Sequence, residues 1–141
     1  MLNFSESIAG YADGASSSMQ NLSSAAWAIF APSDELVSFR GICIGWSKNN
    51  IVEYSTLIGL LFDAISLGIH WIIIRLDSQL VVVQLIGIYI IWNLEIHCMF
   101  LRVRILEMYF EFIQYQHISK NLNTLTNSLV NFVLNRHSRH M

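Results

Sequence analysis

The 141-residue chain is poor in charge, proline and cysteine, and these shortages exclude several classes of protein. Charged residues make up 13% of the chain, which is about half the share that is usual in soluble domains. With 7 glycines, 1 proline and 2 cysteines, the chain is neither collagen-like nor a disulfide scaffold. Cys43 and Cys98 lie far apart and lack metal-ligand spacing, which predicts two buried thiols in a reducing compartment.

The sequence also lacks an excess of positive charge. Its net charge is −2, so there is no overall basic signature of nucleic-acid binding. The basic residues and histidines after the last acidic residue, Glu111, are Lys120, Arg136, Arg139, His117, His137 and His140. On charge alone, a solvated tail is favoured over a contact surface for phosphates. The first ten residues, MLNFSESIAG, contain no basic residue, which predicts no secretory signal and an intracellular location.

Apolar residues are abundant: they make up 54% of the chain, and the mean hydropathy is +0.48. This composition excludes disorder as the main state and is enough for the core of one domain. The most apolar stretch, Leu57–Ile74, contains Asp63 and Gly68. The stretch Leu80–Trp92 contains 13 residues, fewer than the roughly 20 that a spanning helix requires. We therefore expect no transmembrane span.

The first half of the sequence predicts three strands. Residues 7–12 form a strand that leads into a turn at Asp13-Gly14, and residues 25–31 form a second strand. Pro32-Ser33-Asp34 is typical of a turn, because proline fixes φ and aspartate tolerates tight turns. A third strand is expected over residues 35–45. Short connections between the three favour an antiparallel meander.

The rest of the chain alternates helices and strands. Asn49-Asn50 is expected to cap a helix that ends at Gly68. The apolar run His70–Leu76 predicts a buried, parallel strand, and Asp77-Ser78 can cap a following helix. The remaining expected elements are helices at 79–86, 93–111 and 123–134 and a strand at 112–118. This order predicts an α/β domain with a mixed sheet, in which helices cover a central strand on both faces.

Several polar residues fall at the ends of these elements. Asp13, Glu53 and Asp77 are carboxylates at a strand end, a helix start and a strand end, and His117 precedes the last helix. In an open α/β sheet, functional groups gather where strand ends and helix starts meet. Three carboxylates together would raise each other's pKa unless a cation is present, and oxygen ligands favour Mg²⁺ or Mn²⁺. Singly, each residue has an ordinary structural explanation, as a turn residue, a partner of a helix dipole or a cap.

Four segments in this order give the sequence a resemblance to a known family. They are YADGAS at 11–16, NNIVEYSTLIGLLFDAISLGI at 49–69, DSQLVVVQLIG at 77–87 and HISKNLNTLTNSLV at 117–130. The sequence resembles type 1 ribonuclease H, most of all the reverse-transcriptase-like branch of plant genomes and retroelement polyproteins. The resemblance covers about residues 8–135 of a single domain, 1–141. It implies a ribonuclease H-like fold, with helices flanking a five-stranded mixed sheet in the order 3-2-1-4-5.

The resemblance implies an endonuclease that hydrolyses the RNA strand of RNA–DNA hybrids. Asp13, Glu53 and Asp77 match the first three acidic positions of the family's metal site, with Asp13 as the residue that bridges both ions. Two Mg²⁺ or Mn²⁺ ions roughly 3.5–4 Å apart would hold the scissile phosphate. His117 matches the family's mobile histidine, which helps to move the proton and to release the product. The resemblance also allows a place in a larger reverse-transcriptase polyprotein, and we expect a monomer.

The fourth metal-ligand position departs from the family. The family's pattern is H-x5-N-x3-D, which His117 and Asn123 fit, but the last position here is Asn127. An amide keeps one oxygen for coordination and loses the negative charge, which weakens metal binding. The small number of Lys and Arg residues also lowers the expected affinity for phosphates. The alternative is a weakened or inactive domain that still binds nucleic acid.

A hybrid would be recognised by the shape of its minor groove and by the 2′-hydroxyls of one strand. By their place in the matched segments, the expected contacts are Gly14, Ser16, Asn49, Asn50, Ser78, Gln79 and Asn123.

Overall fold

The computed structural model describes residues 8–126, 128 and 131–132. Its elements are β1 (Ile8–Ser17), β2 (Leu22–Phe30), β3 (Leu36–Gly45), α1 (Asn49–Ser66), β4 (Trp71–Leu76), α2 (Gln79–Leu85), α3 (Leu94–Glu107), β5 (Phe112–His117) and the short 3₁₀ helix η2 (Lys120–Asn123). The succession of strands and helices follows the prediction up to β5.

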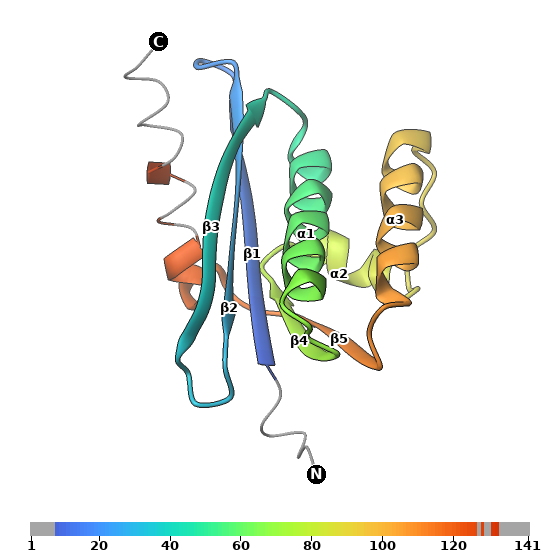
Figure 1. Cartoon of the computed structure of the whole chain (residues 1–141). Coiled ribbons are helices and arrows are strands. Elements are labelled where there is room, and N and C mark those ends of the chain that lie inside the picture. The colour runs from blue at the N-terminus through green and yellow to red at the C-terminus, as the bar shows by residue number, and fades with distance from the viewer. Residues whose placement is uncertain (1–7, 127, 129–130, 133–141) are drawn as a thin grey trace.

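The five strands form one mixed sheet in the order β3-β2-β1-β4-β5 (Figure 1). β1, β2 and β3 form an antiparallel meander. β4 pairs in parallel with β1 on one side and with β5 on the other. The meander, the parallel strand and the sheet order 3-2-1-4-5 are all confirmed, so the chain has the ribonuclease H-like α/β fold that was expected.

The predicted turn at Asp13-Gly14 is wrong. β1 continues through both residues to Ser17, because Asp13 and Gly14 pair with Ala26 and Ala25 of β2 in an unbroken register. The turn between these strands comes later, and its last residue, Asn21, has a φ of 53°. Asp13 is therefore fixed within a strand, which holds its backbone more firmly than a turn would.

The helix ends agree with the sequence at some positions and differ at others. Asn49 and Asn50 do not cap α1: they lie in its first turn, and Lys48 is the N-cap, without a side-chain hydrogen bond. Gly68 ends the helix with a φ of 74°, as expected. Ser78 and Asn93 cap α2 and α3 through their side chains. α3 ends at Glu107, earlier than predicted, because residues 108–111 turn the chain into β5.

The helices α1, α2 and α3 lie on one side of the sheet (Figure 1). α1 approaches β2 so closely that a Cβ atom on Gly59 would lie 2.5 Å from the Trp27 ring. On β4, the alternate residues Ile72, Ile74 and Leu76 are buried, whereas Trp71, Ile73 and Arg75 are only partly buried. The expectation that helices cover the central strand on both faces stays a prediction, because the expected final helix, 123–134, lies partly outside the described residues.

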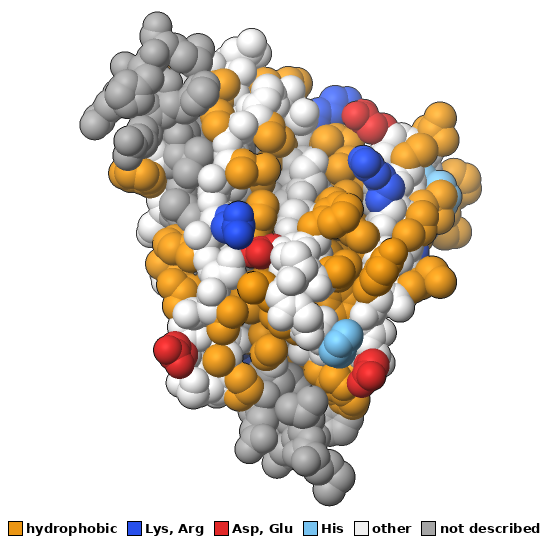
Figure 2. Space-filling model, viewed as in Figure 1, with side chains coloured by type: hydrophobic (Ala, Val, Ile, Leu, Met, Phe, Trp, Pro, Cys, Tyr) orange, Lys and Arg blue, Asp and Glu red, His pale blue; other side chains and the backbone are white. Residues whose placement is uncertain are grey.

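Much of the apolar composition lies on the surface. Figure 2 shows apolar side chains spread over the visible face, with few charged side chains between them. Trp92 in the loop before α3 is 88% exposed, and Met108 after α3 is 82% exposed. Cys98 is also exposed and Cys43 partly buried, so the prediction of two buried thiols is wrong. Within the described ranges, no helix is both long and apolar enough to cross a membrane.

The predicted final helix, 123–134, falls partly outside the described residues. Residues 124–126, 128 and 131–132 are helical, which agrees with the prediction, although the chain forms η2 before them. Asn127 lies outside the described residues, so its predicted place at the metal site is not addressed by the structure.

Candidate active site

Two of the predicted acidic residues come from neighbouring parallel strands. The pairing of β1 with β4 ends at Ala12 and Leu76, which lie opposite each other. Asp13 and Asp77 are the next residues of their chain segments, so the sheet itself brings them to the same place. Asp13 is 6% exposed. The register of β1 against β4 thus brings together two aspartates that lie far apart in the sequence.

The third acidic residue, Glu53, comes from the first turns of α1. The helix can lie close to β1 there because Gly14 has no side chain: a Cβ atom would lie 2.6 Å from Cγ1 of Val52. Asp13 and Glu53 line the same small cavity, of about 10 Å³, together with Ala12, Leu76 and Val81. Gly14 therefore allows α1 to lie close to β1, and this role is separate from its predicted contact with a ligand.

The three carboxylates, which we call the acidic site, affect one another's ionisation. Burial, the charge of Asp77 and the charge of Glu53 raise the pKa of Asp13 to about 7, while Lys120 and the Gly14 backbone N–H act in the opposite direction. Burial also raises the pKa of Glu53, and the Asp77 charge adds to this. The site thus has more negative charge than its surroundings balance. A bound divalent cation would relieve this excess, and the oxygen donors suit Mg²⁺ or Mn²⁺.

The acidic site does not form a compact set of metal ligands in this structure. Among the residues that the structure describes, no three His, Cys, Asp or Glu side chains are grouped so that they could hold a metal ion. The electrostatic influence of Asp77 on both Asp13 and Glu53 nevertheless places the three predicted residues in one neighbourhood.

Two neutral side chains hold the carboxylates in place. The Ser78 hydroxyl hydrogen-bonds to Glu53 and also accepts the backbone N–H of Val81 as the cap of α2. Asn123 donates its amide to the Ala12 carbonyl at 3.0 Å and to Oδ2 of Asp77 at 3.4 Å. Asn123 is 2% exposed. Its burial and these two hydrogen bonds give it a role in holding Asp77 and the end of β1 together, and its expected contact with a hybrid stays a prediction.

The other predicted residues lie around the acidic site. His117 is the exposed last residue of β5 and pairs with Leu76, immediately before Asp77. Asn49, Asn50 and Gln79 lie at the starts of α1 and α2. The Ser16 hydroxyl contacts Ser23 Oγ at 2.8 Å and donates to the Ser47 carbonyl at 2.7 Å. This serine cluster ties the β1–β2 hairpin to the segment before α1.

Sequence reasoning gave no role to Lys120. Its charge lowers the pKa of both Asp13 and Glu53, which indicates that the ammonium group lies near the acidic site. Only its place three residues after His117 could have suggested this. Thr126 was missed as well; its hydroxyl is within hydrogen-bonding distance of the Asn123 side-chain oxygen and orients that amide.

Comparison with known proteins places this chain in a family. The reverse transcriptase-like family model matches residues 11–133. A ribonuclease HI of Halobacterium salinarum is 30% identical over 127 residues, which are 90% of this chain and 64% of that protein. A bifunctional protein of Mycobacterium tuberculosis is 32% identical over 88 residues. The match includes 24% of the length of the mycobacterial protein, so the chain corresponds to only part of that relative.

Solved structures show the same fold. The crystal structure of the Halobacterium salinarum RNase H1 superposes with a TM-score of 0.87 at 30% identity, covering 92% of this chain and 98% of that one. LC11-RNase H1 in complex with an RNA/DNA hybrid superposes with a TM-score of 0.86 at 23% identity, covering 92% and 98%. The chain therefore belongs to the reverse transcriptase-like family of ribonuclease H domains.

Proposed function

We propose that this domain is a divalent-metal-dependent endonuclease that hydrolyses the RNA strand of RNA–DNA hybrids. The observation that carries the proposal is the burial of Asp13 beside Glu53 and Asp77, with the pKa of Asp13 raised to about 7. A purely structural carboxylate would gain nothing from such neighbours. Membership of the family and the likeness to a ribonuclease HI support this activity.

Asp13, Glu53 and Asp77 would hold the ions, and the family resemblance adds Asn127 as a fourth ligand. When bound, two Mg²⁺ or Mn²⁺ ions would lower the pKa of a water molecule and stabilise the leaving oxygen. Ser78 orients Glu53 through its hydroxyl, and Asn123 orients Asp77 through its amide. His117, exposed at the same end of the sheet, would transfer a proton to or from the solvent.

The hybrid would lie across the ends of β1, α1 and α2. Asn49, Asn50 and Gln79 offer amide groups there, and the backbone around Gly14 and Ser16 borders the same region. Contacts of this kind can read 2′-hydroxyls and groove width and carry little sequence information. One chain supplies all three carboxylates, so we propose a monomer as the active unit. It could act alone or within a longer reverse-transcriptase polyprotein.

A cleavage assay with a matched pair of variants tests the proposal. A labelled RNA–DNA hybrid is incubated with Mg²⁺ or Mn²⁺ and with the parent chain, Asp13→Asn or Asp34→Asn. Asp34 is an exposed turn residue with a φ of 69°, a conformation that asparagine also tolerates. We expect cleavage by the parent and by Asp34→Asn, and none by Asp13→Asn. Absence of cleavage by the parent, or equal cleavage by all three, would contradict the proposal.

A second candidate function is binding of nucleic acid without cleavage. Asn127 in place of an aspartate, the net charge of −2 and the open form of the acidic site among the described residues favour it. The two functions separate in one experiment, because a binding domain retards a labelled hybrid in a native gel and leaves it intact with either metal.

A further inference from the structure

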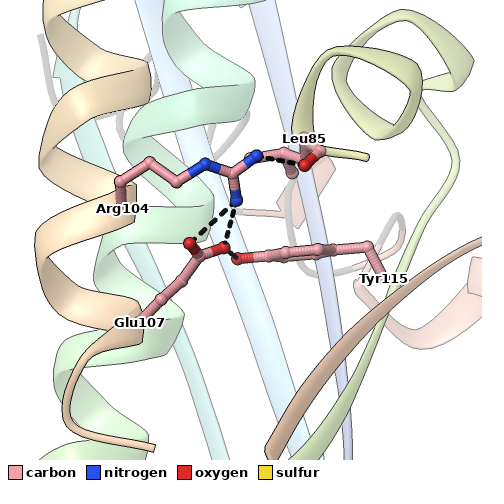
Figure 3. Close-up of polar contacts among 4 residues, drawn as sticks. All are labelled: Leu85, Arg104, Glu107 and Tyr115. Atoms are coloured by element: carbon pink, nitrogen blue, oxygen red, sulfur yellow. Dashed lines mark hydrogen bonds and ion pairs between the residues drawn. The ribbon is translucent and has the colours of Figure 1, made fainter. Parts of the chain in front are cut away.

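A second cluster of charged and polar groups lies at the C-terminal end of α2, whereas the acidic site lies at its N-terminal end. Arg104 of α3 donates from Nη1 to both carboxylate oxygens of Glu107, at 2.8 Å and 2.7 Å. The Tyr115 hydroxyl of β5 donates to Oε2 of Glu107 at 2.6 Å. Figure 3 shows these three side chains meeting beside the backbone of Leu85, whose carbonyl accepts a hydrogen bond from Nη2 of Arg104. We call these residues the Arg104 cluster.

Several contacts hold the side chains of the Arg104 cluster in fixed positions. The Arg104 guanidinium lies 4.5 Å from the centre of the Phe100 ring, which adds a cation–π contact. Burial, and then the Glu107 carboxylate, raise the pKa of Tyr115 well above its ordinary value, so the phenol remains a hydrogen-bond donor. The planar guanidinium also joins two partners at a fixed distance, since Nη1 contacts Glu107 and Nη2 contacts the Leu85 carbonyl, which the single nitrogen of a lysine could not do in the same geometry.

The contact with Leu85 fixes the C-terminal end of α2. Leu85 is the last residue of this helix, whose final carbonyl groups have no partner within the helix. A second contact holds the same end of the helix: the Tyr54 hydroxyl of α1 donates to the Gln84 side chain at 2.7 Å. Two independent hydrogen bonds thus set where α2 ends.

The other end of α2 carries the acidic site. Ser78 caps the helix and hydrogen-bonds to Glu53, and Asp77 precedes Ser78. The helix spans Gln79–Leu85, roughly 10 Å at about 1.5 Å per residue. A helix this short moves as one rigid piece. A shift at Leu85 therefore moves Ser78 and Asp77 relative to Glu53.

We propose that Arg104 is a positioning residue for the acidic site: the Arg104 cluster sets the place of α2 and thereby the affinity of Asp13, Glu53 and Asp77 for a divalent cation. This inference rests on the proposed function. It predicts that a change at Arg104 alters metal binding although Arg104 contacts none of the three carboxylates.

The main test variant is Arg104→Met with Glu107→Gln. Changing both partners avoids leaving a half-buried charge unpaired, and Met keeps an apolar stem against Phe100. We expect the Mg²⁺ concentration at half-maximal thermal stabilisation to rise by about tenfold, in the range of losses seen when outer partners of metal ligands are changed. Tyr54→Phe removes only the hydroxyl at the Gln84 contact and is expected to shift the midpoint in the same direction, by less.

Asp63→Asn is the matched control. Asp63 is also a carboxylate with several hydrogen bonds, but its partners lie on β2 and β3, away from α2. We expect this variant to lose stability and to keep the Mg²⁺ midpoint of the parent. A double variant that folds and keeps the parent midpoint would overturn the inference, as would an equal shift in Asp63→Asn.

A metal-free measurement separates this inference from the proposed function. The backbone amide chemical shifts of Asp77 and Ser78 are compared in the parent, the double variant and Asp63→Asn. We expect them to move in the double variant and to stay in Asp63→Asn. If the parent responds to neither Mg²⁺ nor Mn²⁺, the proposed function fails, and the amide shifts still decide the inference. Unmoved shifts in the double variant would refute it.

Discussion

Asp13 and Asp63 are two aspartates with almost the same burial and opposite surroundings. Asp13 is 6% exposed and Asp63 is 7% exposed. Oδ2 of Asp63 accepts hydrogen bonds from Trp27 at 3.0 Å and from Ser38 at 2.6 Å, and lies 3.4 Å from Nε of Arg40. Asp13 instead has Asp77 and Glu53 as charged neighbours, and its pKa rises to about 7.

Asp63 is a carboxylate that stabilises the fold, whereas the surroundings of Asp13 favour the binding of a cation. The donors around Asp63 come from two strands, so its charge connects α1 to the sheet. The neighbours of Asp13 make its ionised form unfavourable in the metal-free protein. A site that costs stability without its ligand is typical of function. Four experiments, from the largest expected effect to the smallest, test this comparison.

The pH dependence of stability should differ most between the parent and Asp13→Asn. The pKa of Asp13 is raised from 3.8 to about 7, so the folded state binds more protons than the unfolded state between these values. The metal-free parent should therefore lose stability as pH rises from about 4 to about 7, by at most about 4 kcal/mol at about 1.4 kcal/mol per unit. Urea unfolding at several pH values measures the difference from Asp13→Asn. A constant difference would contradict the prediction, and saturating Mg²⁺ should reduce the loss.

Asp63→Ala should destabilise the protein at neutral pH. The change leaves the Trp27 N–H, the Ser38 hydroxyl and Arg40 without their shared acceptor. We expect a loss of about 3 kcal/mol in the free energy of unfolding. The Mg²⁺ midpoint of the folded protein should not change. A variant as stable as the parent would show that Asp63 does not have the structural role assigned to it.

Asn127→Asp should sharpen the contrast, because the proposed fourth ligand would then bring a further negative charge to the acidic site. We expect the Mg²⁺ concentration needed for half-maximal stabilisation to fall roughly tenfold, which is about 1.4 kcal/mol. Asn121→Asp adds the same charge at an exposed position of η2 and serves as the control. Equal effects of the two variants would mean that general charge, and not ligation, is responsible.

Ser78→Ala should have the smallest effect on stability and a specific effect on the acidic site. Loss of the N-cap of α2 should cost about 1 kcal/mol, and Glu53 loses a hydrogen bond that lowers its pKa. Asn93→Ala removes the corresponding cap of α3, where the side chain accepts from Ile96 at 3.0 Å. Both variants should lose similar stability in urea. Only Ser78→Ala should weaken the response to Mg²⁺, and an equal response would count against the role of Ser78.

The residue patterns predicted most of the strands because the signals of a strand are local, whereas the order of the strands in the sheet came from the family resemblance. The apolar run 70–76, the turn at Pro32 and the cap at Gly68 each act within a few residues, and each prediction agrees with the structure at that place. The prediction failed where a partner elsewhere decides the conformation. β1 passes through Asp13-Gly14 because β2 pairs with it, which no turn propensity of these two residues could show.

The candidate site was predicted by residue type and order, not by geometry. Asp13, Glu53 and Asp77 were identified from their places at element ends, and the family resemblance joined them. The supporting side chains were harder to find. The role of Asn123 depends on a hydrogen bond to the Ala12 carbonyl, and that of Lys120 on its approach through η2. Such contacts depend on tertiary structure and have no local sequence signal.

The contact between Asn123 and Ala12 also has a consequence for the order of folding. It joins residues 111 positions apart, whereas Arg75 and Tyr11 of the β1–β4 pair are 64 apart. Long loops are closed late, since their entropy must be lost before any contact repays it. The β1–β2–β3 meander should form first, and the acidic site should be completed by the last segments to join. We therefore expect Asp13 to be separated from Asp77 and Lys120 during the early stages of folding.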